Sequence, residues 1–260
     1  MSELSTRLSV LRTGLAMFLL VLLLPAAPPS FAESTPPADP ALKQAVEQMI
    51  EQYIRAHPEV IEQSLQALEA KRGAEEKARQ MAAIANRQQD LLNDPSSPVS
   101  GNPKGDVTVV EFFDYRCGYC KRAAGAVTQL QQEDSRVRVI YKDFPILGEA
   151  SELAAKAALA SKAQGKHRAF HEALLAAKGD MTKETILAVA HEVGLDTKRL
   201  ETDMANPEWE AVIDRNRALA KDLGISGTPG FIVGTELVPG ALDLNGLKDL
   251  IARAGNHAPY

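Results

Sequence analysis

Cysteine is scarce in this chain of 260 residues: there are two, Cys117 and Cys120, in the stretch EFFDYRCGYC. A disulfide that closes so short a loop would constrain the unfolded chain little, so a purely structural role would achieve little. A structural zinc site needs four ligands, and there is no second cysteine pair to complete one. His167 and His171 could join the pair, but we expect both on a helix surface. These absences favour a chemical role for the two thiols.

Positive charge is also in short supply. The chain has 29 Lys and Arg against 34 Asp and Glu, a net charge of −5, and no basic block. Nucleic-acid binding needs a positive patch that displaces counterions, so the composition argues against a nucleic-acid partner.

The chain has one long apolar run, Leu15 to Leu24, and it is too short for the roughly 20 residues that span a bilayer. Arg7 and Arg12 precede it. Small residues at Ser30 and Ala32 mark a cleavage site. Residues 1–32 are therefore predicted to be a signal peptide cut after about Ala32, with an uncleaved anchor as the alternative. The mature protein is expected in the oxidising bacterial periplasm.

Residues 40–92 predict an N-terminal helical segment. Asp39 caps a first helix that has Pro40 at its first position, and Pro58 begins a second helix. The apolar stripes are narrow, and nothing nearby in the sequence covers them. The segment should therefore dock on the following domain or assemble with copies of itself. The stripes contain Val46, Ile50, Tyr53, Ile61, Leu65 and Leu68.

Residues 93–105 read as a proline-rich linker, and residues 106–260 as the main domain. The almost wholly apolar 107–113 predicts a strand buried on both faces, and CGYC then opens a helix. A strand at 137–141, a helical block at about 149–223, a hairpin at 231–238 and a helix at 244–254 follow. This order predicts an α/β, thioredoxin-like fold with a helical insertion.

A C-x-x-C at a strand-to-helix junction has a clear chemical logic. Unpaired N–H groups and the helix dipole stabilise the thiolate of Cys117. Cys120 lies about one turn further on and can resolve a mixed disulfide at Cys117. Compared with an ordinary cysteine, a thiol of lowered pKa attacks only a little faster, because its thiolate is a weaker nucleophile. The same thiolate is, however, a better leaving group. The pair should therefore donate and exchange disulfides, and should not be a strong reductant.

Two further positions belong to the predicted site. Glu111 shares a strand face with Val109 and Phe113, where burial would raise its pKa and suit it to carry a proton for Cys120. The alternative is that Glu111 lies near the strand end and reaches solvent. The sequence GTPG before the last strands predicts a cis Thr228–Pro229 bond that offers backbone to a substrate peptide.

The motifs VVEFFDYRCGYCK and GISGTPGFIVG together resemble the DsbA-like branch of the thioredoxin superfamily, over residues 106 to about 254. The resemblance implies that Glu111 is the buried proton carrier and that Thr228 tunes reactivity. Gly118 and Tyr119, with a threonine before the proline, are similar to disulfide isomerases of the DsbC type. The strong oxidase DsbA typically has Pro-His and valine at these places, and this chain departs from that pattern.

A helical segment before a DsbA-like domain resembles the suppressor-of-copper-sensitivity C (ScsC) proteins, whose N-terminal helices build an oligomer. The resemblance implies an exported isomerase, most simply a homotrimer, without cofactor or metal. Its partners would be misfolded or reduced secreted proteins and a membrane redox partner. A monomeric DsbA-type oxidase is the first alternative. A copper-binding or holdase protein that uses Cys117 and Cys120 as soft ligands is the second, but Glu111 and Pro229 favour catalysis.

Overall fold

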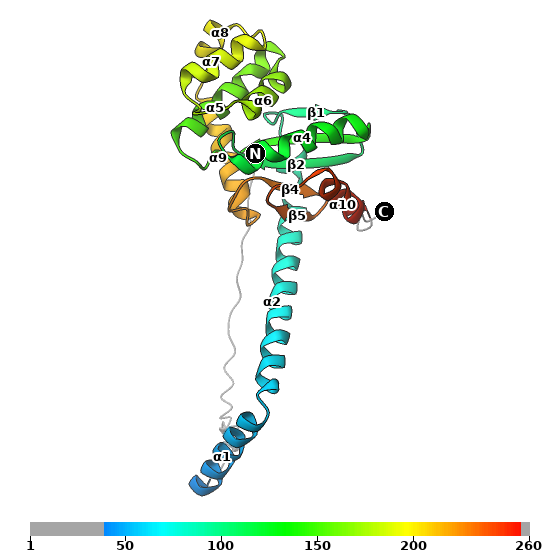
Figure 1. The fold of residues 1–260 in the computed structure, drawn as a ribbon, viewed down its shortest axis with the longest axis vertical. Coiled ribbons are helices and arrows are strands. Elements are labelled where there is room, and N and C mark those ends of the chain that lie inside the picture. Colours follow the sequence, from blue (N-terminus) through cyan, green and yellow to red (C-terminus); the bar gives the residue numbers. More distant parts are fainter. Residues whose placement is uncertain (1–38, 256–260) are drawn as a thin grey trace, which may run out of the picture. The chain divides into compact units, whose positions relative to one another are not determined.

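The computed structural model describes residues 39–255, and the predicted signal peptide and its cleavage site lie outside them. The chain divides into two compact units between Ile61 and Glu62. Figure 1 shows the fold and labels most of its helices and strands. No helix in the described range is long and apolar enough to cross a membrane.

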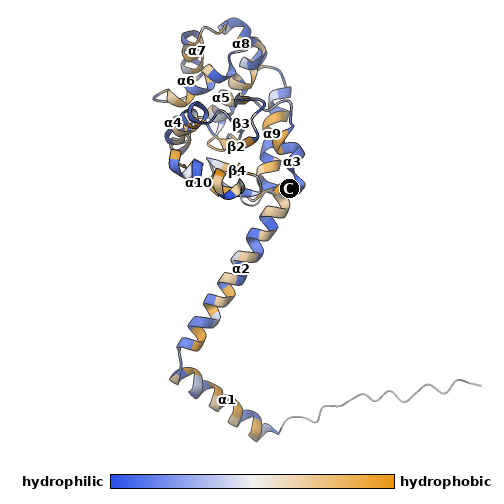
Figure 2. Cartoon of the chain, turned by 90° about the vertical axis from the view of Figure 1, so that its right-hand side faces the viewer, coloured by the Kyte–Doolittle hydropathy of each residue, from blue (hydrophilic) through white to orange (hydrophobic). Residues whose placement is uncertain are grey.

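The first unit contains α1 (Pro40–Ala56), which begins and ends where the sequence predicts. The Asp39 carboxylate accepts a hydrogen bond from the backbone N–H of Ala41 (3.0 Å), and Pro40 occupies the first helical position. No side chain of α1 is buried. Apolar residues alternate with polar ones along the helix (Figure 2). This helix therefore keeps its apolar stripe exposed to solvent within the chain.

Helix α2 (Glu59–Asn86) runs into the second unit and is followed by α3 (Gln88–Leu92). Most of α2 is exposed, but Ile84 and Leu91 are fully buried against Val110 and Phe112 of the sheet. The end of the predicted segment 40–92 is therefore part of the main domain's core.

The sheet has five strands in the order β1-β3-β2-β4-β5. Central β2 pairs parallel with β3 and antiparallel with β4, while β1 and β5 form the antiparallel edges. The strands are β1 (Val99–Gly101), β2 (Val107–Phe113), β3 (Val137–Asp143), β4 (Gly230–Val233) and β5 (Glu236–Pro239).

The predicted proline-rich linker at 93–105 contains a strand, β1. Val99 pairs with Ile140, so the sheet begins before residue 106. Three residues between a proline and a turn are too few to show strand alternation in the sequence.

Alternation along β2 sorts its side chains onto the two faces of the sheet. Val109 and Phe113 enter the larger core, which includes Val127 of α4 (Gly118–Glu133) and Leu247 of α10 (Leu244–Gly255). The opposite face packs on α9 (Glu208–Asp222), α3 and the end of α2. The redox motif therefore starts a helix that is fixed on a fully packed sheet.

The predicted helical block lies between β3 and β4. Its α6 packs on α4, and Phe170 and Leu174 of α6 are fully buried in the larger core. The block contains α5 (Glu149–Ala160), the 3₁₀ turn η1 (Ser161–Gln164), α6 (His167–Ala176), α7 (Lys183–Glu192), α8 (Thr197–Met204) and α9 (Glu208–Asp222).

Candidate redox site

Cys117 is the N-cap residue of α4, as the sequence predicts. Its side chain is 8% exposed, and its thiol donates a hydrogen bond to the carbonyl oxygen of Thr228 (3.2 Å). The first N–H groups of α4 have no partner within the helix, and Cys117 lies at that end of it. Cys117 therefore keeps a small exposed area beside the helix N-terminus.

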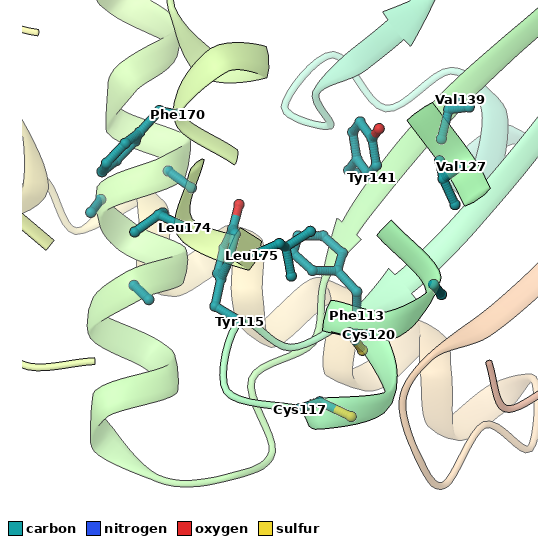
Figure 3. Packing of buried hydrophobic residues seen from close by; sticks show 14 of the residues in the cluster. Phe113, Tyr115, Cys117, Cys120, Val127, Val139, Tyr141, Phe170, Leu174 and Leu175 are labelled. Atoms are coloured by element: carbon teal, nitrogen blue, oxygen red, sulfur yellow. The ribbon is translucent and has the colours of Figure 1, made fainter. Parts of the chain in front are cut away.

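Cys120 lies one turn further along α4 and is completely buried beside Phe113 (Figure 3). Both cysteines are free thiols in this structure. Burial raises the pKa of the Cys120 thiol well above its usual value, and the nearby Glu111 raises it further. Of the two thiols, only Cys117 can meet a protein substrate without a rearrangement of the core.

Glu111 is 1% exposed, which excludes the alternative that it reaches solvent at a strand end. Burial alone raises the pKa of Glu111 to about 8, and its Oε1 atom has no hydrogen-bond partner. A carboxyl group that is protonated near neutral pH and interacts with Cys120 can give or take a proton there.

The Thr228–Pro229 bond is cis, as predicted. Pro229 is buried, Thr228 is half-buried, and the Thr228 carbonyl meets the Cys117 thiol. The Pro229 carbonyl oxygen accepts a hydrogen bond from the N–H of Gly240 (2.8 Å), which fixes the loop. Two segments that lie 111 residues apart in sequence thus meet at Cys117.

Gly118 and Tyr119 are exposed at the start of α4. The Tyr119 side chain is 60% exposed, and the Arg122 guanidinium lies 4.0 Å from the centre of its ring. This cation–π contact holds an aromatic surface beside the reactive thiol.

Asp114 is a central residue of the site that the sequence analysis missed. It is 1% exposed, and its carboxylate accepts four hydrogen bonds, from the N–H groups of Arg116, Ile146 and Leu147 and from the Ser151 hydroxyl. In a turn an aspartate side chain often accepts a hydrogen bond from the backbone N–H two residues on, so an aspartate directly after a strand indicates a turn, but it does not indicate the contacts to residues 146, 147 and 151.

The expectation that His167 and His171 lie on a helix surface is wrong. Both are buried, their rings stack, and the Tyr115 hydroxyl lies 2.9 Å from Nδ1 of His171. Burial lowers the pKa of His167 to about 3 and that of His171 well below its usual value, so both are neutral. They share a helical stripe with Phe170 and Leu174, which is the signal that could have revealed their burial.

Among residues 39–255, no group of three or more His, Cys, Asp or Glu side chains is arranged to hold a metal ion.

Comparison with known proteins agrees with this geometry. A family described as the DSBA-like thioredoxin domain matches residues 108–252, and the ScsC N-terminal domain of copper resistance proteins matches residues 43–75. A thioredoxin-like oxidoreductase from Silicibacter pomeroyi is 50% identical, with a TM-score of 0.64, over 66% of this chain and 99% of that chain.

A linker-deletion mutant of ScsC from Proteus mirabilis is 25% identical, with a TM-score of 0.64, over 86% of this chain and 100% of that chain. The Na(+)/H(+) antiporter NhaA 1 of Salinispora arenicola is 29% identical over 158 residues, 60% of this chain. The match spans about a quarter of that relative's length (24%). With a family match across its sheet, redox motif and insertion, the chain belongs to the DsbA-like thioredoxin-domain family and has an ScsC-type N-terminal segment.

Proposed function

We propose that this protein is an exported, periplasmic protein disulfide isomerase. The observation that carries the proposal is the pairing of a partly accessible Cys117 at a helix N-terminus with a fully buried Cys120 one turn away. The family match supports thiol–disulfide exchange in general, and isomerisation is the specific activity that we propose.

In the proposed reaction the Cys117 thiolate attacks one sulfur of a wrong disulfide in a misfolded protein. A Cys117–substrate disulfide forms, and the other substrate sulfur leaves as a thiolate. A different substrate thiolate then attacks the substrate sulfur of this mixed disulfide and expels the Cys117 thiolate. One disulfide is exchanged for another, and no net electrons are transferred.

Cys120 can release the substrate from a mixed disulfide that no substrate thiolate has attacked. Its thiolate attacks Cys117 Sγ, the substrate leaves reduced, and a Cys117–Cys120 disulfide forms. A membrane redox partner that reduces this disulfide would return the pair to the dithiol form. Glu111 removes the proton from Cys120 as it attacks and returns it when the disulfide is reduced.

Four residues around the pair are proposed to contact substrate. Thr228 and Pro229 present backbone beside Cys117, and Gly118 and Tyr119 form the exposed surface next to it. A threonine carbonyl that accepts a hydrogen bond from Cys117 in the free protein is in position to tune its reactivity.

The N-terminal helices are proposed to assemble copies of the chain, most simply three. On α1, Val46 and Ile50 are 44% and 53% exposed, and on α2, Leu65 and Leu68 are 55% and 41% exposed. Burial of a large apolar side chain contributes about 1.5–3 kcal/mol, so several such residues per chain can outweigh the cost of association. Several redox sites in one assembly would also raise the effective concentration for the next attack on a bound substrate.

Reactivation of scrambled, wrongly bridged ribonuclease tests both parts of this proposal. We expect the reduced mature protein to be a trimer by light scattering and to restore ribonuclease activity. The double variant V46E/I50E should be monomeric at micromolar concentration, because it places charges in the apolar stripe. It should reactivate ribonuclease about tenfold more slowly, since each encounter then offers one site.

The matched control is Q48E/Q52E, which adds the same two charges to exposed polar positions of α1. It should remain a trimer with wild-type activity. A monomeric wild-type protein that oxidises reduced ribonuclease but does not reactivate the scrambled form would favour a monomeric DsbA-type oxidase instead.

A further inference from the structure

Asp114 lies between the central strand and the redox motif, and its backbone contacts both cysteines. It directly follows β2 and is 1% exposed. Its carbonyl oxygen accepts a hydrogen bond from the N–H of Cys117 (3.1 Å). Burial raises the pKa of the Cys120 thiol, and a hydrogen bond from the Asp114 N–H to the Cys120 sulfur opposes this effect. One buried residue therefore fixes the backbone around both thiols.

The Asp114 carboxylate joins the motif to a distant part of the chain. Its Oδ1 atom accepts hydrogen bonds from the N–H of Arg116 and from the hydroxyl of Ser151, both at 2.8 Å. Its Oδ2 atom accepts the N–H groups of Ile146 (2.9 Å) and Leu147 (3.0 Å). Each carboxylate oxygen thus has two donors, and the start of the motif is fixed to the loop between β3 and α5 and to the first turn of α5.

The place at which the chain enters α4 is held by these contacts and not by a side-chain cap. Cys117 is the N-cap residue with an extended backbone (φ −69°, ψ 116°), and it makes no side-chain capping hydrogen bond. In many helices the N-cap side chain accepts a hydrogen bond from the first turn and so fixes the entering chain. At α4 the hydrogen bonds of Asp114 to the N–H groups of Arg116 and Cys117 have this effect instead.

Resolution of a mixed disulfide needs the two sulfurs in one arrangement. In that step the Cys120 thiolate bonds to Cys117 Sγ, the Cys117–substrate bond breaks, and the substrate sulfur leaves as a thiolate with the bonding electron pair. In the proposed reaction Glu111 takes the Cys120 proton. Cys120 is completely buried in the larger core, so the alignment depends on where Cys117 is held. Because the step is intramolecular, a displacement of about 1 Å can slow it about a hundredfold.

We propose that Asp114 positions Cys117 for attack by Cys120 and thereby sets the rate at which mixed disulfides are resolved. The inference rests on the proposed function, because it concerns the resolving step of that reaction. The first attack on a substrate disulfide has no such requirement, since it takes place at the exposed edge of Cys117 and does not involve Cys120. Loss of the Asp114 contacts therefore slows resolution more than the first attack.

Asp114→Asn tests the proposal, because its amide replaces one acceptor oxygen with a donor that faces other donors. The reduced full-length mature protein is mixed with glutathione disulfide and quenched with acid at successive times. Mass spectrometry then quantifies the glutathione adduct and the Cys117–Cys120 disulfide. We expect the adduct to convert to the internal disulfide about tenfold more slowly in Asp114→Asn than in wild type. The first attack, measured in a Cys120→Ser background where the adduct cannot resolve, should change by less than about twofold.

Two further variants sharpen the test. Ser151→Ala removes one of the four hydrogen bonds and keeps the carboxylate, so it should slow resolution about threefold and decides the question if Asp114→Asn does not fold. Asp243→Asn is the matched control, because this exposed carboxylate precedes α10 and accepts the N–H of Gly246 (2.8 Å). It should leave both rates unchanged.

The outcomes separate this inference from the proposed function. Wild-type rates of resolution in Asp114→Asn and Ser151→Ala, or an equal slowing of attack and resolution, would overturn the positioning role of Asp114 while exchange at Cys117 stands. A wild-type protein that does not react with glutathione disulfide, or whose adduct never yields the internal disulfide, would overturn the proposed function and this inference with it.

Discussion

Cys117→Ser should abolish thiol–disulfide exchange, with a loss of at least about a thousandfold, because a serine hydroxyl is not a nucleophile at neutral pH without a neighbouring base. Cys120→Ser should have a different effect. It keeps the attacking thiolate but removes the resolving one, so mixed disulfides with substrate should accumulate. Stopped-flow exchange with glutathione disulfide measures the first effect, and mass spectrometry of the adduct measures the second.

The two variants serve as controls for each other, since both remove one thiol and both should keep the fold. Stable adducts on the Cys117→Ser variant, through Cys120, would show that the buried cysteine is the nucleophile and would reverse the assignment.

Glu111→Gln should stabilise the reduced protein at pH 8 by about 2 kcal/mol. Burial raises the pKa of Glu111 from 4.5 to about 8, so the folded state holds a proton that the unfolded state has lost. The stability tied to this proton is complete below about pH 4.5 and is lost as the pH rises through 8. Glutamine cannot ionise and escapes that loss, although its buried amide offsets part of the gain.

Urea unfolding of the reduced protein at pH 5 and pH 8 measures this effect. At pH 5 the folded wild type keeps its Glu111 proton, whereas Glu111 in the unfolded state, with a pKa of 4.5, is about three-quarters ionised. Between pH 5 and pH 8 the linked proton changes the relative stability by about 3–4 kcal/mol, so at pH 5 the advantage of Glu111→Gln should be lost and wild type should be more stable by about 1–2 kcal/mol. Burial also raises the pKa of Asp143 to about 8. In wild type and in Glu111→Gln alike, this group should therefore lower the free energy of unfolding as the pH rises.

Glu69→Gln, at an exposed position of α2, should leave stability unchanged at both pH values. A Glu111→Gln variant that is less stable than wild type at pH 8 would contradict a neutral, buried Glu111. The substitution should also slow the release of mixed disulfides above neutral pH, because the base for Cys120 is then missing. Wild-type release rates across that range would leave Glu111 without a catalytic role.

The site residues that the sequence predicts are those whose roles depend on residues close to them in the chain. The N-cap position of Cys117 follows from a C-x-x-C after an apolar strand, and Glu111 is buried because the strand VTVVEFF is buried on its core side. The cis Thr228–Pro229 bond was indicated by its motif together with the resemblance. Each of these features depends on few residues that are close in sequence.

The features that the sequence did not reveal depend on tertiary contacts. Asp114 joins the motif to residues 146, 147 and 151, and such partners leave no local pattern. His171 looked like a surface histidine because histidine is polar, yet it finds a buried partner in the Tyr115 hydroxyl.

The packing of the end of the N-terminal segment also depends on tertiary contacts. Ile84 and Leu91 pack beneath the sheet, and the buried Lys142 amine donates to the Asp90 carbonyl oxygen (2.6 Å) and the Ser97 hydroxyl (2.7 Å). These contacts show why a chain that starts near residue 105 would lose part of its core. Substitutions in α1 are therefore a cleaner test of assembly than truncation.

The central claim is that Cys117 is the reactive thiol and Cys120 the buried, resolving one. Alkylation of the reduced protein from pH 3 to pH 9, followed by peptide mapping, tests it most directly. The account predicts that Cys117 is labelled first throughout, while Cys120 stays unlabelled until the protein unfolds, because its sulfur is buried and its pKa is raised. Labelling of Cys120 ahead of Cys117 in the folded protein would contradict the account.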